Sequence, residues 1–290
     1  MAAHVQPAAG SASAAAPRHL LGLDALSEAE FGALLDLAAV MKRHPLAWRT
    51  TLEGRAIACL FEQPSTRSRA SLQVAIHRLG ALPVMLAPRE LGGGDSLAET
   101  ARVLSSYCDA IAVRTPRHRD LLELAEHASV PVLNALTDRE HPCRALADCL
   151  TLRDRFGGLR GLPVAYLDGR EAVAYSLIEA AILSRIEMRI AVPPLLRPDP
   201  DLLARAGQSV RICDTPHEAV RGAVAVYTAG WRGEMPELLS LTAPRAVLMT
   251  ARGREMPTDV LDEPRSEQAA NLLGIHQAML RTLVTGDWEV

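Results

Sequence analysis

Short apolar runs alternate with helical patterns along most of the 290 residues, and this alternation limits the folds that the chain can adopt. Helices are expected between the runs, beginning with 20–41, where Ser27 and Glu30 have the spacing of a capping box. Alternating strands and helices are typical of open, mostly parallel α/β sheets, which bind ligands at the carboxyl ends of their strands. The sequence therefore predicts an α/β protein with two such sheets. Buried strands are expected at 56–61, 82–86, 110–113, 130–133, 164–168, 189–192, 210–213, 223–227 and 246–249.

A glycine-rich break divides the chain into two parts. The stretch F-G-G-L-R-G-L-P, at Phe156–Pro163, interrupts the alternation, which then restarts, and such clusters favour loops. We expect a first domain at 18–155 and a second at 156–265. The Ala-rich start, 1–17, is expected to be a disordered tail. It lacks the basic and apolar regions of a secretory signal, which favours a cytoplasmic protein.

Composition excludes several classes of function. Aromatic residues make up 3% of the chain and the formal net charge is −3, with no basic block, so no nucleic-acid partner is expected. No apolar run reaches the roughly 18 residues that span a bilayer, so no membrane partner is expected either. The five cysteines are scattered, which indicates reduced thiols and neither disulfides nor a zinc site. Lys42 is the only lysine, which disfavours Schiff-base chemistry.

The loop after the first expected strand is rich in anion-binding groups. It reads Ser65-Thr66-Arg67-Ser68-Arg69 and leads into a helix. Free backbone N–H groups and the positive end of the helix dipole meet at such a junction, where they favour an anion. Two guanidinium groups and three hydroxyls add donors that suit a phosphate. The alternative is a helix cap with two surface arginines.

Two further strand ends carry polar side chains. Arg114 follows the expected strand at 110–113, and His141 follows the one at 130–133. A single histidine is more often structural than functional. Three neighbouring strand ends that each supply a binder of anions or carbonyl groups together indicate one site.

At these residues the sequence resembles a known family. F-E-Q-P-S-T-R-S-R, at 61–69, resembles the S-T-R-T-R signature of the aspartate and ornithine carbamoyltransferases. H-P-C-R-A-L-A-D, at 141–148, resembles their H-P-C-Q-x-L-A-D segment. The stretch at 91–115, which begins L-G-G-G-D-S, looks like the loop and helix between those motifs in ornithine enzymes. The similarity covers about Leu20 to Leu283.

The resemblance implies a first domain that binds carbamoyl phosphate and a second that binds an amine acceptor, without a metal or an organic cofactor. Arg69 would be a structural partner. Arg144 stands where the family has a glutamine that touches the carbamoyl nitrogen, and arginine is longer, charged and without an acceptor. The phosphate would be held by Ser65, Thr66, Arg67 and Ser68, and the carbamoyl oxygen by Arg114 and His141 with help from Thr66 and Arg67.

The resemblance also implies how subunits and elements assemble. A homotrimer is expected, in which the loop at 91–96 reaches into a neighbour's site. The final segment, 266–290, is expected to form a helix that packs back on the first domain.

The second half departs from the pattern of ornithine enzymes, which carry G-D-G-N-N, D-x-x-x-S-M-G and H-C-L-P segments. Ala172 stands at the second asparagine, and Ala229 at the aspartate that would hold the amino group. Gly233-Glu234-Met235 replaces S-M-G, H-C-L-P is absent, and Leu272 replaces an arginine that touches the donor. Because buried polar groups need partners, these changes predict rejection of ornithine.

Charged and aromatic residues near the second-domain strand ends could form a different acceptor site. Each also has a structural interpretation: Asp168 as a helix cap, Glu171 in a first helical turn, Trp231 packed between domains, and the others as solvated charges. The candidates are Asp168, Arg170, Glu171, Trp231, Arg232, Glu234 and Arg252.

Two functions follow from these observations. The first is a carbamoyltransferase that acts on an amine other than ornithine, in specialised biosynthesis. The second is a catalytically inactive relative that serves as a binding or partner subunit. The intact phosphate loop favours the first, and the missing acceptor motifs favour the second.

Overall fold

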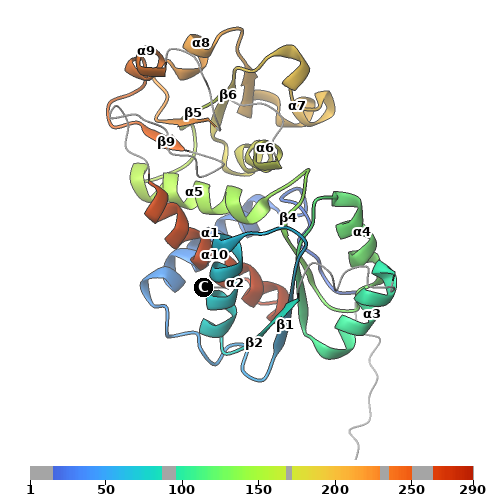
Figure 1. Cartoon of the computed structure of the whole chain (residues 1–290). Coiled ribbons are helices and arrows are strands. Elements are labelled where there is room, and N and C mark those ends of the chain that lie inside the picture. The colour runs from blue at the N-terminus through green and yellow to red at the C-terminus, as the bar shows by residue number, and fades with distance from the viewer. Residues whose placement is uncertain (1–15, 87–95, 168–171, 229–234, 250–263, 290) are drawn as a thin grey trace, which may run out of the picture.

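The computed structural model describes residues 16–86, 96–167, 172–228, 235–249 and 264–289. Two parallel β-sheets, each flanked by helices, lie one above the other in Figure 1. This arrangement confirms the prediction of two open α/β sheets. We call the part built on the first sheet the first domain, and the part built on the second sheet the second domain.

The first sheet has the strand order β2-β1-β3-β4, and every pair is parallel. Alternate residues of β1 face opposite sides, as the two-residue period of a strand requires. Ile57, Cys59 and Phe61 join the core on one side of the sheet, whereas Ala58 and Leu60 join the core on the other side. The elements are β1 (Ala56–Phe61), α2 (Thr66–Arg78), β2 (Leu82–Leu86), α3 (Leu97–Tyr107), β3 (Ala110–Arg114), α4 (His118–His127) and β4 (Val132–Leu136).

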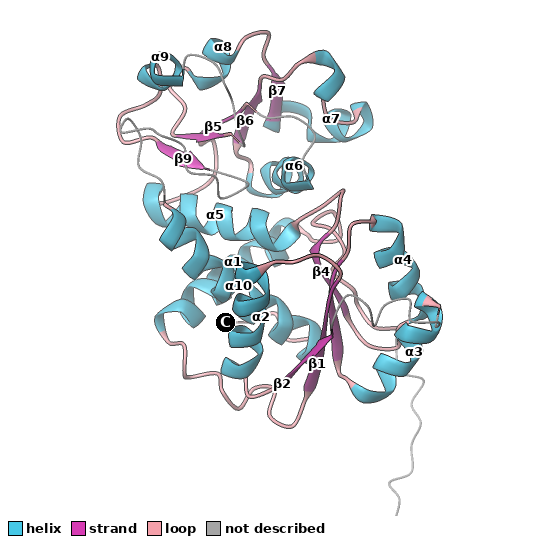
Figure 2. Ribbon diagram, in the orientation of Figure 1, coloured by secondary structure: helices cyan, strands magenta, loops and turns pink. Residues whose placement is uncertain are grey.

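The second sheet has the strand order β7-β6-β5-β8-β9, again parallel throughout. Figure 2 shows its short strands with helices around them. The elements are β5 (Pro163–Tyr166), α6 (Ala172–Ser184), β6 (Glu187–Ile190), α7 (Pro200–Ala206), β7 (Val210–Ile212), α8 (Pro216–Val220), β8 (Ala225–Tyr227), α9 (Met235–Ser240) and β9 (Val247–Met249).

Three long helices hold the domains together: α1 (Glu28–Arg43), α5 (Pro142–Phe156) and α10 (Arg265–Thr285). The last of these packs against α1, α2 and α5 of the first domain. Its Gly274 lies against α1, where a Cβ atom would come within 2.8 Å of the Ala38 carbonyl oxygen. Glycine therefore permits the close approach of the two helices.

Capping residues explain several boundaries. The capping box of Ser27 and Glu30 forms as predicted, but α1 begins at Glu28, so the expected start at residue 20 is wrong. Leu20 instead pairs with β4, donating its N–H to Val132 and accepting from Asn134 at 2.9 Å each. Ser96 caps α3 as expected, through a 3.1 Å bond from the Glu99 N–H.

Other boundaries differ from expectation. The strand expected at 130–133 is β4 at 132–136, which brings its end closer to His141. The strand expected at 189–192 is β6 at 187–190, and α9 was not predicted. The predicted break after α5 is present, because Gly157 ends the helix with φ 80°. Most of the predicted tail and most of the loop at 91–96 lie outside the described residues.

Three general findings bear on function. Within the described ranges, no helix is long and apolar enough to cross a membrane. The same residues include no group of three or more side chains that could hold a metal ion. All five cysteines are free thiols and buried, and burial raises the pKa of Cys59 and Cys143 to about 12.

Candidate functional site

Three strands of the first sheet end side by side. Phe61 at the end of β1 pairs with Arg114 at the end of β3, and Arg114 in turn pairs with Leu136 at the end of β4. Arg67 lies in the first turn of α2, which follows β1, and His141 lies at the end of the connection from β4 to α5. The predicted convergence of three strand ends is thus a consequence of the strand order β1-β3-β4.

The first turn of α2 presents the serine and threonine hydroxyls. Ser65 is the N-cap residue in an extended conformation, and its side chain makes no capping bond within the described part of the chain. The first backbone N–H groups of a helix have no acceptor inside it, so they face outward together with the dipole. Thr66 and Arg67 are exposed there. This turn is suited to a phosphate.

Arg114 is fixed beside this turn. Its Nη1 donates to the Oγ of Ser68 at 3.3 Å, and burial lowers the pKa of its guanidinium. Arg69 points elsewhere, with its guanidinium carbon 5.9 Å from the centre of the Phe61 ring. The structure therefore separates Arg67 from Arg69, which packs on the ring of Phe61.

His141 lies just before α5, close to Arg114 and Arg144. Burial, followed by the charges of Arg144, Arg114 and His276, holds its pKa well below the usual value for histidine. The ring is therefore neutral at neutral pH. Its Nδ1 is buried and has no hydrogen-bond partner among the described residues. A neutral imidazole of this kind can donate to a carbonyl oxygen through one ring nitrogen.

The backbone of His141 is held by the second domain. Its N–H donates to the Oγ of Ser176 on α6 at 2.9 Å. Ser176 is fully buried. The position of the histidine thus depends on how α6 sits against the first domain.

Arg144 is tied to a buried carboxylate. Its Nε lies 2.8 and 3.0 Å from the two oxygens of Asp148, one helical turn away on α5. Gln268 on α10 donates to the same carboxylate at 2.8 Å. Burial raises the pKa of Asp148, while Arg144 and then Gln268 oppose the rise.

A cavity of about 160 Å³ connects the phosphate loop to α10. Arg67 and Arg144, both predicted as donor-binding residues, line it together. The Oγ of Ser71 is 2.9 Å from the Nδ1 of His276, which joins α2 to α10 beneath this space. Three guanidinium groups face one small volume, which favours an anionic ligand. The complete lining is Arg67, Ser71, Arg144, Arg265, Gln268, Ala269 and Leu272.

Sequence reasoning missed several of these residues. The pair of Arg144 and Asp148 has the i,i+4 spacing of a helical ion pair, which was a usable signal. Ser71 lies three residues after Ser68 on a predicted helix, and so on the same face. Ser176 and Gln268 give no local signal, because their partners are 35 and 120 residues away.

The predicted acceptor residues are not located by the structure. All of them lie outside the described residues, as does Ala229. Leu272 and Ala172 are described, and Leu272 lines the cavity beside Arg265. The candidates concerned are Asp168, Arg170, Glu171, Trp231, Arg232, Glu234 and Arg252.

The geometry defines a two-domain α/β protein in which guanidinium and hydroxyl groups gather at the strand ends of the first sheet. A family model described as the carbamoyl-P binding domain of aspartate/ornithine carbamoyltransferase matches residues 18–154. An ornithine carbamoyltransferase of Acidothermus cellulolyticus is 39% identical to the chain, over 92% of this chain and 96% of that protein.

Solved structures agree with this match. The crystal structure of ornithine carbamoyltransferase from Thermus thermophilus has a TM-score of 0.84 and 37% identity, and covers 93% of this chain and 100% of that one. The enzyme of the same name from Pyrococcus furiosus has a TM-score of 0.84 and 33% identity, with coverages of 93% and 98%. The chain belongs to the aspartate/ornithine carbamoyltransferase family, which confirms the resemblance drawn from its motifs.

Proposed function

We propose that the protein transfers the carbamoyl group of carbamoyl phosphate to an amine other than ornithine. The observation that carries the donor half of this proposal is the cluster of Ser68, Arg114, His141 and Arg67 around the ends of β1, β3 and β4. Cationic groups and a neutral imidazole gathered at a helix N-terminus suit a small phosphorylated carbonyl compound.

Each group has a distinct role in the proposed reaction. The phosphate lies on the first turn of α2, held by Ser65, Thr66, Arg67 and Ser68. Arg114 and the neutral His141 donate to the carbamoyl oxygen, and so stabilise the negative charge that develops there. A fixed donor of this kind contributes about 3 kcal/mol to comparable acyl transfers.

The bond changes are those of a direct displacement. The neutral amine attacks the carbamoyl carbon and forms a C–N bond while the C–O bond to phosphate breaks. The departing phosphate is held by Arg67 and accepts the proton that the amine loses. This reaction needs no metal, no cofactor and no covalent intermediate on the protein.

The acceptor is inferred from the sequence of the second domain. Alanine at 229 and the absence of an H-C-L-P segment remove the groups that the family resemblance assigns to ornithine. The relatives described above are named ornithine carbamoyltransferases, so ornithine is the competing acceptor. Asp168, Glu171, Trp231, Arg232, Glu234 and Arg252 are proposed to form the altered acceptor site.

A second candidate function is an inactive relative that binds the donor or a partner protein. Leu272 leaves the cavity without the arginine of the family pattern, and Arg144 is engaged by Asp148. Both features alter the site that contacts the carbamoyl group. They distinguish this chain from the family pattern on the donor side as well as on the acceptor side.

One experiment separates these possibilities. The protein is incubated with carbamoyl phosphate and a panel of amines that includes ornithine, and ureido products are measured by mass. We expect a product with an amine other than ornithine and its loss in Arg67→Ala. Arg78→Ala, which removes a guanidinium from the other end of the same helix, should leave turnover unchanged. A dominant ornithine product contradicts the altered acceptor, and donor binding without any product favours the inactive relative.

We also infer a homotrimer located in the cytoplasm. Exposed apolar side chains at Val103 and Tyr107 on α3 and at Leu122 on the neighbouring α4 offer a surface for subunit contact. Five buried, reduced thiols fit a reducing compartment.

The trimer can be tested by light scattering, which should give three times the mass of one chain. Tyr107→Glu should lower the measured mass. A monomeric wild-type protein contradicts the trimer.

A further inference from the structure

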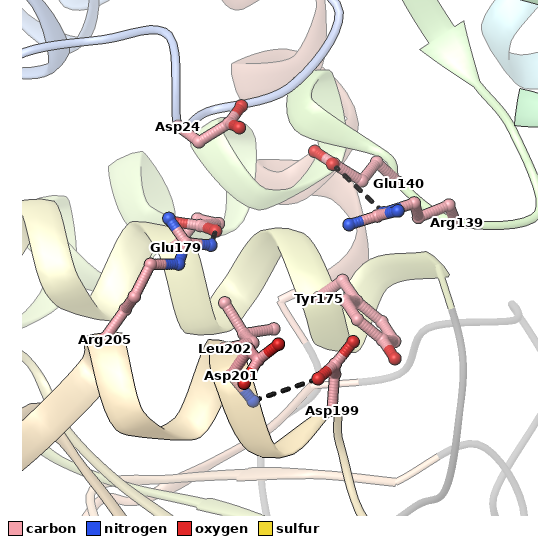
Figure 3. A pocket seen from close by; sticks show the side chains of 9 residues that line it. All are labelled: Asp24, Arg139, Glu140, Tyr175, Glu179, Asp199, Asp201, Leu202 and Arg205. Atoms are coloured by element: carbon pink, nitrogen blue, oxygen red, sulfur yellow. Dashed lines mark hydrogen bonds and ion pairs between the residues drawn. The ribbon is translucent and has the colours of Figure 1, made fainter.

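A second cavity, of about 190 Å³, lies between the two domains and is lined by acidic side chains. On the first domain it contacts the segment that precedes α1 and the connection from β4 to α5. On the second it contacts α6 and the start of α7 (Figure 3). Five carboxyl groups and two guanidinium groups face it. The lining consists of Asp24, Arg139, Glu140, Tyr175, Glu179, Asp199, Asp201, Leu202 and Arg205.

The two arginines do not neutralise this cavity. Arg205 forms an ion pair with Glu179. The Nε of Arg139 lies 4.0 Å from the Oε1 of Glu140, which is a long distance for an ion pair. Within the described part of the chain, no arginine or lysine lies within 4.0 Å of the carboxylates of Asp24, Asp199 or Asp201. The excess of negative charge therefore comes from both domains.

Glu140 is a buried carboxyl group at the cavity and gives a second observation beside the charge of the lining. The residue is 8% exposed, and its Oε2 atom is buried without a hydrogen-bond partner among the described residues. Figure 3 shows the carboxyl groups of Asp24 and Glu140 pointing toward one another. Burial, and then the charge of Asp24, raise the pKa of Glu140 to about 7, with Glu179 adding to the rise and Arg139 and the backbone of Leu23 opposing it. Arg139, 4.0 Å away, is a distant partner for this buried carboxyl group, and a second cation in the cavity would stabilise its charged form.

Apolar surface separates the acidic groups. Leu202 is buried at the wall of the cavity, and the half-buried ring of Tyr175 lies beside it. A metal ion would need converging oxygen ligands at about 2.0–2.6 Å, and the described residues contain no such group. Carboxylates at two sides with an apolar wall between them match an alkyl chain with a charged group at each end.

We propose that this cavity binds an alkyl diammonium ion that bridges the carboxylates of the two domains. One ammonium group contacts Asp24 and Glu140 of the first domain, and the other contacts Asp199 and Asp201 of the second. The bound ion offsets the repulsion between acidic groups across the domain interface, and so favours the packed arrangement of the domains. The site is separate from the phosphate loop, and the inference does not depend on the proposed transfer reaction.

The test is calorimetry of the full-length protein with 1,4-diaminobutane at pH 8 and low salt, with butane-1,4-diol as the neutral control. We expect the diamine to bind and the diol not to bind. Asp24→Asn and Asp201→Asn each remove one exposed carboxylate, one from each domain, and should each weaken binding about three- to fivefold. The double variant should weaken binding about tenfold. Lowering the pH to 6 should also weaken it, because Glu140 then gains a proton.

Glu123→Gln is the matched control, because it removes an exposed carboxylate on α4 that does not line the cavity. It should bind the diamine as the wild type does, and circular dichroism of every variant confirms the fold. The proposal is overturned if the wild type does not bind the diamine, or if it binds the diol equally well. It is also overturned if either single variant binds as tightly as the wild type, which would place the diamine elsewhere, or if Glu123→Gln weakens binding equally.

Discussion

The guanidinium of Arg114 donates a hydrogen bond to the hydroxyl of Ser68 across 3.3 Å, joining the end of β3 to the first turn of α2. This bond fixes the group that is proposed to contact the carbamoyl oxygen relative to the group that is proposed to hold the phosphate. Ser68 is buried at this contact.

Ser68→Ala should therefore weaken donor binding more than it weakens the fold. We expect about a tenfold loss in affinity for carbamoyl phosphate or a bisubstrate phosphonate, and about 1 kcal/mol of stability, the typical net value of one hydrogen bond. Calorimetry and urea unfolding measure the two quantities. Ser106→Ala on α3 removes a hydroxyl that bonds only to its own helix and should affect neither. Unchanged donor affinity in Ser68→Ala would show that the contact is not part of the site.

Arg144→Gln, which introduces the residue of the family motif, should destabilise this protein. The substitution leaves the fully buried carboxylate of Asp148 without its cation, and breaking such a pair costs about 3–5 kcal/mol. The double variant Arg144→Gln with Asp148→Asn should recover most of the loss, because no buried charge remains. Denaturant unfolding of the wild type, both single variants and the double variant provides the complete cycle. If the losses in unfolding free energy of the two single variants add up to the loss in the double variant, the pairing is contradicted.

Glu140 should make the protein less stable as the pH rises. Its pKa of about 7 lies above the usual 4.5, so the folded state binds this proton more tightly than the unfolded chain does. Its contribution is therefore favourable below about pH 4.5, and is lost as the pH rises to about 7, by on the order of 3 kcal/mol in total. Glu140→Gln should unfold at increasingly higher urea than the wild type between pH 5 and pH 8. Parallel curves for the two proteins would contradict the raised pKa.

His276 should make the protein less stable as the pH falls, which is the opposite of the effect of Glu140. Burial lowers its pKa to about 3, below the usual 6.5, so the unfolded chain takes up the proton first. Stability is lost as the pH falls below about 6.5, by roughly 2 kcal/mol at pH 5. His276→Asn keeps an amide near the hydroxyl of Ser71 but cannot be protonated, and its stability should change less between pH 7 and pH 5. An equal change in both proteins would assign the acid sensitivity to other groups.

Local signals in the sequence were sufficient for much of the fold. The bounds of β1 and β2 match the predicted runs, and Ser27 and Ser96 cap the helices as expected. The start of α1 was predicted too early. The apolar residues around Leu20 fit either a helix or a segment that pairs with the edge of a sheet. Only the contact of Leu20 with β4 decides between the two.

The candidate site was only partly predictable, for a similar reason. Arg67, Arg114 and His141 could be placed together because parallel strands end at the same edge of a sheet. The i,i+4 spacing of Arg144 and Asp148 indicated their ion pair, but the contact of Gln268 with the same carboxylate could not be predicted, because α10 brings it from 120 residues away. The hydrogen bond from the His141 N–H to the Oγ of Ser176 likewise exists only after the two domains meet.

Helix α10 follows the second domain in the chain, yet it covers the core that α1, α2 and the first sheet begin to build. Domains commonly fold from the N-terminus during synthesis, but here the first domain cannot bury this apolar face until the whole second domain and α10 have been synthesised. Folding of the first domain is therefore coupled to synthesis of the second.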